Sequence, residues 1–367
     1  MIIDRAFKSI IRTIRNLRRG IKSKKLRWIY LDLDIPLNER PEPRKNFIQK
    51  RLFPPKILSL AFLEEYFNRL SKLPKFEGII IHLRKQPEGL AKTQSLRDLI
   101  LDFRKTGKKV IIYAHGYDFF KFYVATAADE ICLQQAGNLN IIGLQLSRLL
   151  MKDALAKRNL SADVVPISPY KSAGDMFSKS SISKEDREQY QAIIDSAFDT
   201  FVSDVSLALD KSEKEIIELV NNAPYTAKDS LVKGLVHTII GEEDLIEYVK
   251  NEYSKRKKLV LITWEKSLKK LKIPKPKPAK NTIAVISVEG SIIDGKSKKP
   301  PIKLPIPIFG DDQAGDQTIV RLLRKAKRDK KVKAVVFHVN SGGGSAVASE
   351  AMRSAIKELV KKKPVVT

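Results

Sequence analysis

The chain has 367 residues, enough for about two domains, and its 43% apolar content excludes global disorder. Lysine and arginine outnumber aspartate and glutamate by 69 to 42. The resulting net charge of +27 is typical of a surface that attracts phosphates or anionic lipid headgroups. Cys132 is the only cysteine, which excludes an internal disulfide.

The sequence indicates neither a metal site nor a membrane-crossing helix. No run of about 18 apolar residues occurs, so no transmembrane helix is predicted. The histidines lack the spacing of metal ligands, and we expect no metal and no cofactor. They are His82, His115, His237 and His338.

Residues 1–27 predict a basic amphipathic helix. Its apolar residues recur at steps of three and four, and ten basic residues and one acid occupy most of the other positions. This pattern is typical of a helix lying on an anionic membrane surface, although a helix docked on its own protein or on a partner subunit would look the same. The apolar residues are Ile3, Phe7, Ile10, Ile14, Leu17 and Ile21.

Two segments, 77–113 and 333–367, resemble each other and indicate a tandem duplication with a period of about 255 residues. Each has an apolar run, a glycine-containing loop, an amphipathic helix, a lysine pair and a second apolar run. The runs "GIIIHL" and "AVVFHV" lack alternation, which favours parallel strands buried on both faces and therefore an α/β fold. We interpret His82 and His338, which recur in these runs, as strand residues. In this alignment "PVVT" (364–367) corresponds to "VIIY" (110–113).

The segment "VVPISPYKSAGDMF" (164–177) sets Lys171 among apolar residues. Lys171 is either a surface charge or a lysine held in an apolar pocket, with Tyr170, Met176 and Phe177 as the wall. Burial disfavours an ammonium ion, so a buried lysine can accept a proton near neutral pH.

Between the repeats, "LIEYVKNEYSKRKK" predicts a helix, and "KIPKPKPAKN" (272–281) predicts an extended linker. The Pro-rich segment 296–310 predicts a loop. The first repeat continues for well over a hundred residues beyond the point that corresponds to Thr367, so we expect the second domain to be incomplete. The expected divisions are 1–27 (helix), 28–250 (first domain), 251–281 (helix end and linker) and 282–367 (start of the second domain).

The segment "NSGGGSAVASEAM" (340–352) predicts a strand, a glycine loop and a helix. Successive glycines let backbone N–H groups turn toward a bound anion or a developing oxyanion at the start of the helix. A plain strand–helix turn with Ser345 as the helix cap would explain the same residues. The spacing is not that of a nucleotide-binding loop.

These two segments resemble a known family. "VKAVVFHVNSGGGSAVASEAMRSAI" resembles the "VNSPGGS…ASE" segment of the signal peptide peptidase A (SppA-type) serine–lysine proteases, and "PYKSAGDMF" resembles their "YKSAxEPF" segment. The resemblance covers about residues 28–367, in the order of the long, two-domain members. It implies tandem Clp/crotonase-like α/β domains, assembled into a ring or dome.

The resemblance also implies roles for individual residues. Lys171 would be the general base and Gly343 an oxyanion-hole donor. The family's nucleophile lies in a small-Ser-Gly-Gly segment, which no residue of this sequence matches. In the first repeat the corresponding position falls near Phe119 or Phe120, and "RKQPEGLA" replaces the glycine loop.

The sequence departs from the family pattern at a few positions. Gly342 stands where the family usually has proline, which leaves the loop more flexible, and Gly174 and Asp175 replace bulkier and more acidic positions. The serines near the motifs are interpreted as loop or cap residues. They are Ser172, Ser341, Ser345 and Ser349.

The function implied is a serine endopeptidase whose Ser/Lys dyad degrades cleaved signal peptides or similar hydrophobic peptides. We expect a homo-oligomer, associated peripherally with an anionic membrane surface through residues 1–27, and an inactive chain because the nucleophile is missing. The main alternative is a degenerate homologue with a binding or scaffold role. An acyl-CoA hydratase-like enzyme and a nucleic-acid binder have less support, since no adenine pocket, binding motif or aromatic platform is readable.

Overall fold

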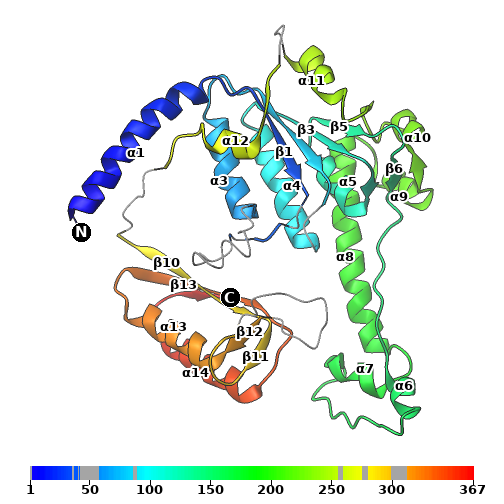
Figure 1. The fold of residues 1–367 in the computed structure, drawn as a ribbon. Helices are drawn as coiled ribbons and strands as arrows, with labels where there is room; N and C mark the ends of the chain where they lie inside the picture. Colours follow the sequence, from blue (N-terminus) through cyan, green and yellow to red (C-terminus); the bar gives the residue numbers. More distant parts are fainter. Residues whose placement is uncertain are drawn as a thin grey trace. The chain divides into compact units, whose positions relative to one another are not determined.

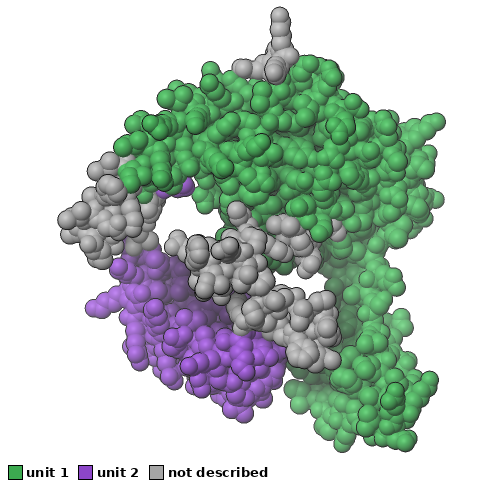
Figure 2. All heavy atoms as spheres, in the orientation of Figure 1, with its two compact units in different colours: residues 1–273 green, residues 274–367 purple. Residues whose placement is uncertain are grey.

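The computed structural model describes residues 2–34, 37–39, 41, 58–85, 89–254, 259–274, 280–298 and 312–367, with side chains from residue 11 onward in the first helix. These residues form two compact units, Met1–Ile273 and Pro274–Thr367 (Figure 2). Most of the expected loop at 296–310 and the middle of the expected linker lie outside the described residues.

The first unit is built on a parallel sheet with the strand order β8-β5-β3-β2-β1-β9 (Figure 1). Every pairing in it is parallel, as the α/β prediction requires. The strands are β1 (Trp28–Leu33), β2 (Gly78–Leu83), β3 (Lys109–Ala114), β5 (Glu130–Leu133), β8 (Thr238–Ile239) and β9 (Leu261–Thr263).

Both faces of this sheet are buried. All six residues of β2 are buried, which confirms the prediction for "GIIIHL". One face packs against α3 (Leu60–Ser71), α4 (Leu90–Arg104) and α5 (Phe119–Ala125), and the other packs against α11 (Leu245–Tyr253). Because successive strand residues face opposite sides, two separate apolar clusters form, one on each face.

Short elements complete the first unit. A second sheet joins β4 (Tyr117–Asp118), β6 (Asn138–Asn140) and β7 (Tyr225–Thr226). The remaining helices of its body are α9 (Glu213–Asn221), α10 (Ala227–Val232) and α12 (Trp264–Leu268).

Phe119 is one of the two residues that the sequence alignment placed near the position of the family's serine. Helix α5 begins at Phe119, and the side chain of Asp118 caps it by accepting the N–H of Lys121. The Phe119 ring is buried and stacks on Phe201, with 3.9 Å between ring centroids. This position is therefore part of the core of the first unit.

The segment that carries Lys171 forms an arm at one end of the long helix α8 (Lys184–Leu209), far from the sheet in Figure 1. The arm contains α6 (Lys152–Ala156), a 3₁₀ turn (Ser172–Gly174) and α7 (Asp175–Ser178). Many of its apolar side chains are exposed, among them Val165 at 87% and Ile167 at 92%.

Helix α1 (Ile2–Ser23) attaches to the first unit through polar groups. Asn16 donates to the carbonyl of Ile273 (3.0 Å) and accepts its N–H (2.7 Å), and Arg19 donates to the carbonyl of Leu271 (3.0 Å). The apolar residues Ile14, Leu17 and Ile21 remain exposed. None of the described helices combines the length and apolar character needed to cross a membrane.

The second unit has a three-stranded parallel sheet in the order β10-β13-β14. Helices α13 (Asp316–Arg328) and α14 (Ala346–Val360) share its apolar cluster. The expectation that "AVVFHV" is buried on both faces is wrong for this unit, since β13 alternates between buried and more exposed residues. The strands are β10 (Thr282–Glu289), β13 (Val332–Asn340) and β14 (Val365–Val366), and a separate pair joins β11 (Ser291–Ile293) to β12 (Gln313–Gly315).

The two units repeat one pattern of strands and helices. The order β3-β2-β1 in the first corresponds to β14-β13-β10 in the second, and each connection carries a helix. When His82 is aligned with His338, Ile79 matches Val335. The partners of these two residues are Val110 and Val365, so "VVT" aligns with "VII" and the sequence alignment of the last strand was wrong by one residue.

Candidate active site

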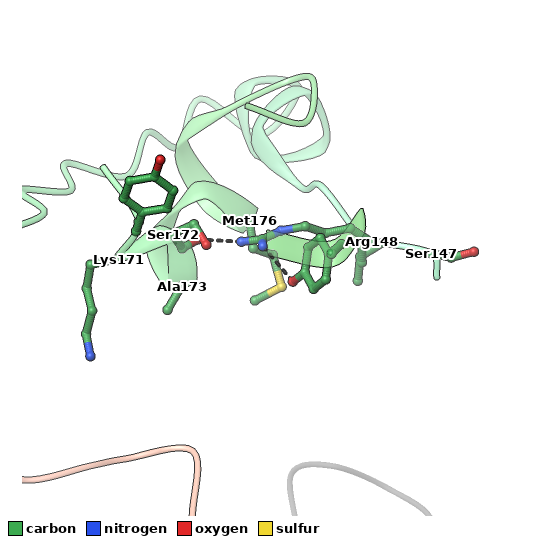
Figure 3. A pocket seen from close by; sticks show the side chains of 9 residues that line it. Ser147, Arg148, Lys171, Ser172, Ala173 and Met176 are labelled. Atoms are coloured by element: carbon green, nitrogen blue, oxygen red, sulfur yellow. Dashed lines mark hydrogen bonds between the residues drawn. The ribbon is translucent and has the colours of Figure 1, made fainter. Parts of the chain in front are cut away.

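Lys171 lies between a loop and the 3₁₀ turn Ser172–Gly174, and its backbone N–H donates to the carbonyl of Ser168 (2.9 Å). It borders a pocket of about 460 Å³, whose lining also includes Arg148, Met176 and Tyr190 (Figure 3). The lysine predicted from the sequence thus borders a wide, open pocket.

The side chain of Lys171 is exposed, so the expectation of a buried amine is wrong for this chain taken alone. Figure 3 shows the amine pointing away from Arg148 and Met176. Of the expected apolar wall only Met176 and Tyr170 line the pocket, and half of Tyr170 is exposed. Within the described residues, no carboxylate pairs with the amine.

The backbone beside Lys171 is held by a buried polar network. Arg148 forms an ion pair with Asp186, in the first turn of α8, and donates to the carbonyl of Ser172 and to the hydroxyl of Tyr190 (2.8 Å). The Ser172 hydroxyl donates to Asp186. Asp186 is almost fully buried. Buried charges persist only when they are paired and hydrogen-bonded, so this network fixes the peptide next to the lysine.

At Gly174 and Asp175, where the sequence departs from the family pattern, contacts within the arm explain the residues present. A Cβ atom on Gly174 would lie 2.3 Å from Cγ1 of Val164, so the close approach of these two segments requires glycine. Asp175 is buried, accepts from the hydroxyl of Ser183 (3.2 Å) and pairs with Lys179 (3.1 Å). Both residues shape the arm around the lysine.

The glycine loop of the second unit is held by Ser341 and Ile292. Ser341 donates its hydroxyl proton to the carbonyl of Gly290 (2.6 Å) and accepts the N–H of Gly343 (3.1 Å). The carbonyl of Gly343 accepts the N–H of Ile292 (2.9 Å). The N–H group that the resemblance implies as an oxyanion donor therefore has an internal acceptor in this structure.

The three glycines of the loop differ in whether a residue with a side chain could replace them. Gly343 and Gly344 have φ values of +109° and +151°, and a Cβ on Gly344 would lie 2.1 Å from the carbonyl oxygen of Ile292. Gly342 has open space around its Cβ position. The loop geometry thus depends on Gly343 and Gly344, and the position where the family has proline tolerates a side chain.

Ser345 caps a helix, as the sequence predicted, whereas Ser349 lies inside that helix and not in a cap or loop. Ser345 caps α14 by accepting the N–H of Ala348 (3.2 Å) and donates to Asp294 (2.9 Å), while Ser349 donates to the carbonyl of Ser345 (2.8 Å). Sequence reasoning missed Arg148 and Asp186, which lie 38 positions apart and carry no motif. Lys171 belongs to the first unit and Gly343 to the second.

Comparisons with known proteins agree with the class that the two motifs indicate. Residues 102–255 match peptidase family S49. The chain is 32% identical to Protease 4 of Haemophilus influenzae over 314 residues, which are 80% of this chain and 48% of that protein. It is 28% identical to the chloroplastic serine protease SPPA of Arabidopsis thaliana over 313 residues, 84% of this chain and 45% of that protein.

The match over residues 102–255 and these relatives confirm the resemblance to the signal peptide peptidase A type of peptidase family S49. The chain spans about half the length of the curated relatives it matches. Among solved structures, it is similar to a mutant of the 1510-N membrane-bound stomatin-specific protease in complex with a substrate peptide. That similarity has a TM-score of 0.38 and 11% identity, over 66% of this chain and 96% of the other.

Replacing Asp186 should loosen the lysine-bearing arm. The change Asp186→Asn removes the charge that compensates Arg148, and breaking a buried ion pair in this way costs about 3–5 kcal/mol. We expect faster hydrogen exchange at the amides of residues 168–176, measured by mass spectrometry. Asp199→Asn, on an exposed position of the same helix, is the control. Equal exchange in both variants would contradict the role given to the network.

Proposed function

We propose that this chain carries the general-base part of a serine–lysine peptidase site, with Lys171 as the base and Gly343 as an oxyanion donor. The observation that carries the proposal is Lys171 itself: its backbone neighbour is fixed to a buried ion pair, while its amine has no acidic partner among the described residues. A lysine without an acidic partner can accept a proton once its amine is removed from solvent.

The proposed reaction is peptide hydrolysis through an acyl-enzyme. The neutral amine of Lys171 takes the proton of a serine hydroxyl as the serine oxygen attacks the peptide carbonyl, and the protonated amine then gives that proton to the leaving amine. The N–H of Gly343 would stabilise the oxyanion, which requires it to turn away from the Ser341 hydroxyl. Water, deprotonated by the same amine, would release the acyl group.

We further propose that the nucleophile is none of the serines beside the two motifs. Ser172 donates to buried Asp186, Ser341 supports the glycine loop and Ser345 caps a helix, so each hydroxyl already has a structural role. The chain by itself would then be inactive. The substrates would be cleaved signal peptides or similar hydrophobic peptides.

Lys171 can be tested in the full product of the gene, with a model signal peptide as substrate. Lys171→Ala should lower kcat by roughly 10²–10⁴-fold, the usual contribution of a general base. Lys171→Arg should be equally inactive, because a guanidinium keeps the charge but cannot be deprotonated in a protein.

Lys157→Ala, which removes an exposed lysine of the same arm, serves as the control and should keep full activity. Unchanged cleavage by either Lys171 variant would exclude the lysine as the base. A full product without any peptidase activity would instead favour a binding or scaffold role.

We propose that the protein is a homo-oligomer in which a second copy covers the lysine-bearing arm. Six large apolar residues between positions 142 and 167 are exposed, and apolar surface left exposed in this way is typical of an interaction site. Covering the arm would also desolvate the exposed Lys171, which its role as a base requires. The residues are Ile142, Leu146, Leu149, Leu160, Val165 and Ile167.

The oligomer proposal predicts that charges on the arm shift the protein toward smaller species. Val165→Asp combined with Ile167→Asp should lower the molar mass measured by light scattering after size exclusion. Leu207→Asp, which is 80% exposed on α8 outside this set, should leave the mass unchanged. A monomeric wild-type protein, or a double variant of unchanged mass, would refute the proposal.

We propose that α1 binds an anionic membrane surface from outside the bilayer core. The helix contacts its own protein through Asn16 and Arg19, which leaves Ile14, Leu17 and Ile21 exposed beside basic residues. This arrangement is that of an interfacial helix, whose binding combines apolar burial with attraction to anionic lipids.

Leu17→Glu should weaken co-sedimentation with phosphatidylglycerol vesicles, because it places a charge in the apolar stripe and lowers the local positive charge. Leu17→Gln separates the loss of apolar surface from the change in charge, and should also weaken binding. Phosphatidylcholine vesicles should bind the wild-type protein poorly. Equal sedimentation of all three proteins would show that α1 does not contact the membrane.

A further inference from the structure

Three potential metal ligands meet at the carboxyl edge of the first unit's sheet. His82 is near the end of β2, His115 follows β3, and Glu242 follows β8. Nδ1 of His82 lies 3.5 Å from Oε1 of Glu242, and Nε2 of His115 lies 3.3 Å from Oε2. One ligand atom from each of the three side chains lies within 4.8 Å of the other two.

These separations suit a small transition-metal ion. Zinc binds imidazole nitrogens at about 2.0–2.1 Å and carboxylate oxygens at about 2.0–2.2 Å, so tetrahedral ligands lie roughly 3.4 Å apart. The separations of 3.5 Å between His82 and Glu242 and of 3.3 Å between His115 and Glu242 are already close to that value. Two imidazoles and one carboxylate form a borderline donor set that favours zinc over magnesium or calcium.

His82 is held in place before any ligand arrives. Its side chain is 1% exposed and packs against the rings of Tyr113 and His115, with centroids 4.9 Å and 5.0 Å away. Tyr30 shares a hydrogen bond with its Nδ1 (2.5 Å), the nitrogen that faces Glu242, and a bound ion would replace this hydrogen bond. The other nitrogen, Nε2, is buried and has no hydrogen-bond partner among the described residues.

The carboxylates around the site are only partly neutralised by Arg84. Arg84 donates to Oε1 of Glu242 (3.1 Å), but its Nε also donates to both carboxylate oxygens of Asp32 (3.0 and 3.2 Å). Two carboxylates therefore share one guanidinium, and Oε2 of Glu242 faces His115. Tyr30, which also donates to Glu242 (3.2 Å), supplies the kind of outer hydrogen bond that orients metal ligands.

We propose that His82, His115 and Glu242 bind a divalent transition-metal ion, with zinc as the best fit. The site is independent of the peptidase proposal, since it uses neither Lys171 nor the glycine loop. The bound ion would cross-link β2, β3 and the turn after β8. His115 is exposed, so solvent can reach the ion and fill the remaining coordination position.

The test is calorimetric titration of the tag-free protein with zinc chloride, after treatment with EDTA and removal of the chelator. We expect one zinc per chain. His115→Ala and Glu242→Gln should each weaken binding by about tenfold or more, and neither residue is in the core. His237→Ala is the matched control. It removes another exposed histidine of the first unit, whose Nδ1 accepts the N–H of Ile131 (3.1 Å), and it should bind zinc normally.

Cobalt(II) gives a second readout, because the intensity of its visible absorption reports tetrahedral coordination. The wild-type protein and His237→Ala should show this band, and Glu242→Gln should lose it while keeping its circular dichroism spectrum. Absence of zinc binding by the wild-type protein overturns the proposal. Binding that is equally strong in His115→Ala and Glu242→Gln overturns it as well.

Discussion

The ion pair between Arg148 and Asp186 is the interaction on which the candidate active site depends. The arm that carries Lys171 has little apolar core of its own and leaves Val165 and Ile167 exposed. The buried ion pair fixes the backbone of the arm, because Arg148 donates to the carbonyl of Ser172 and Asp186 accepts from its hydroxyl. Such a pair gives little net stability, because desolvating both charges offsets most of their attraction. The ion pair does fix the position of Ser172, and with it the peptide bond next to Lys171.

The two repeats share their strand order but differ in the residues at the positions of the two motifs. Both keep parallel strands in the same order, with helices between them. In the first, Phe119, one of the two residues aligned near the family's serine, stacks its ring on Phe201 in the core. In the second, Gly343 and Gly344 adopt positive φ and let the loop approach Ile292. The first unit thus supplies a lysine on an arm and the second a glycine loop, which fits the proposal of a site assembled from unlike parts.

The sequence was sufficient to predict what depends on local pattern. The apolar run "GIIIHL" predicted a buried parallel strand, and the glycine run followed by Ser345 predicted a capped helix start. It was insufficient where the outcome depends on contacts between distant residues. The burial of Lys171 depends on what packs against the arm, and the one-residue shift of the last strand is set by hydrogen bonding between strands. The cluster of His82, His115 and Glu242 joins residues up to 160 positions apart, which no spacing rule can detect.

The most direct test of the proposed role of Lys171 is a structure of the full product of the gene trapped with a peptide boronate. The account predicts a covalent bond from boron to a serine oxygen, with Nζ of Lys171 about 2.6–3.2 Å from that oxygen and the N–H of Gly343 turned toward the boronate. A boronate bound to a serine beside some other base, with Lys171 still in solvent, would contradict it. A full gene product that forms no adduct at all would also contradict it.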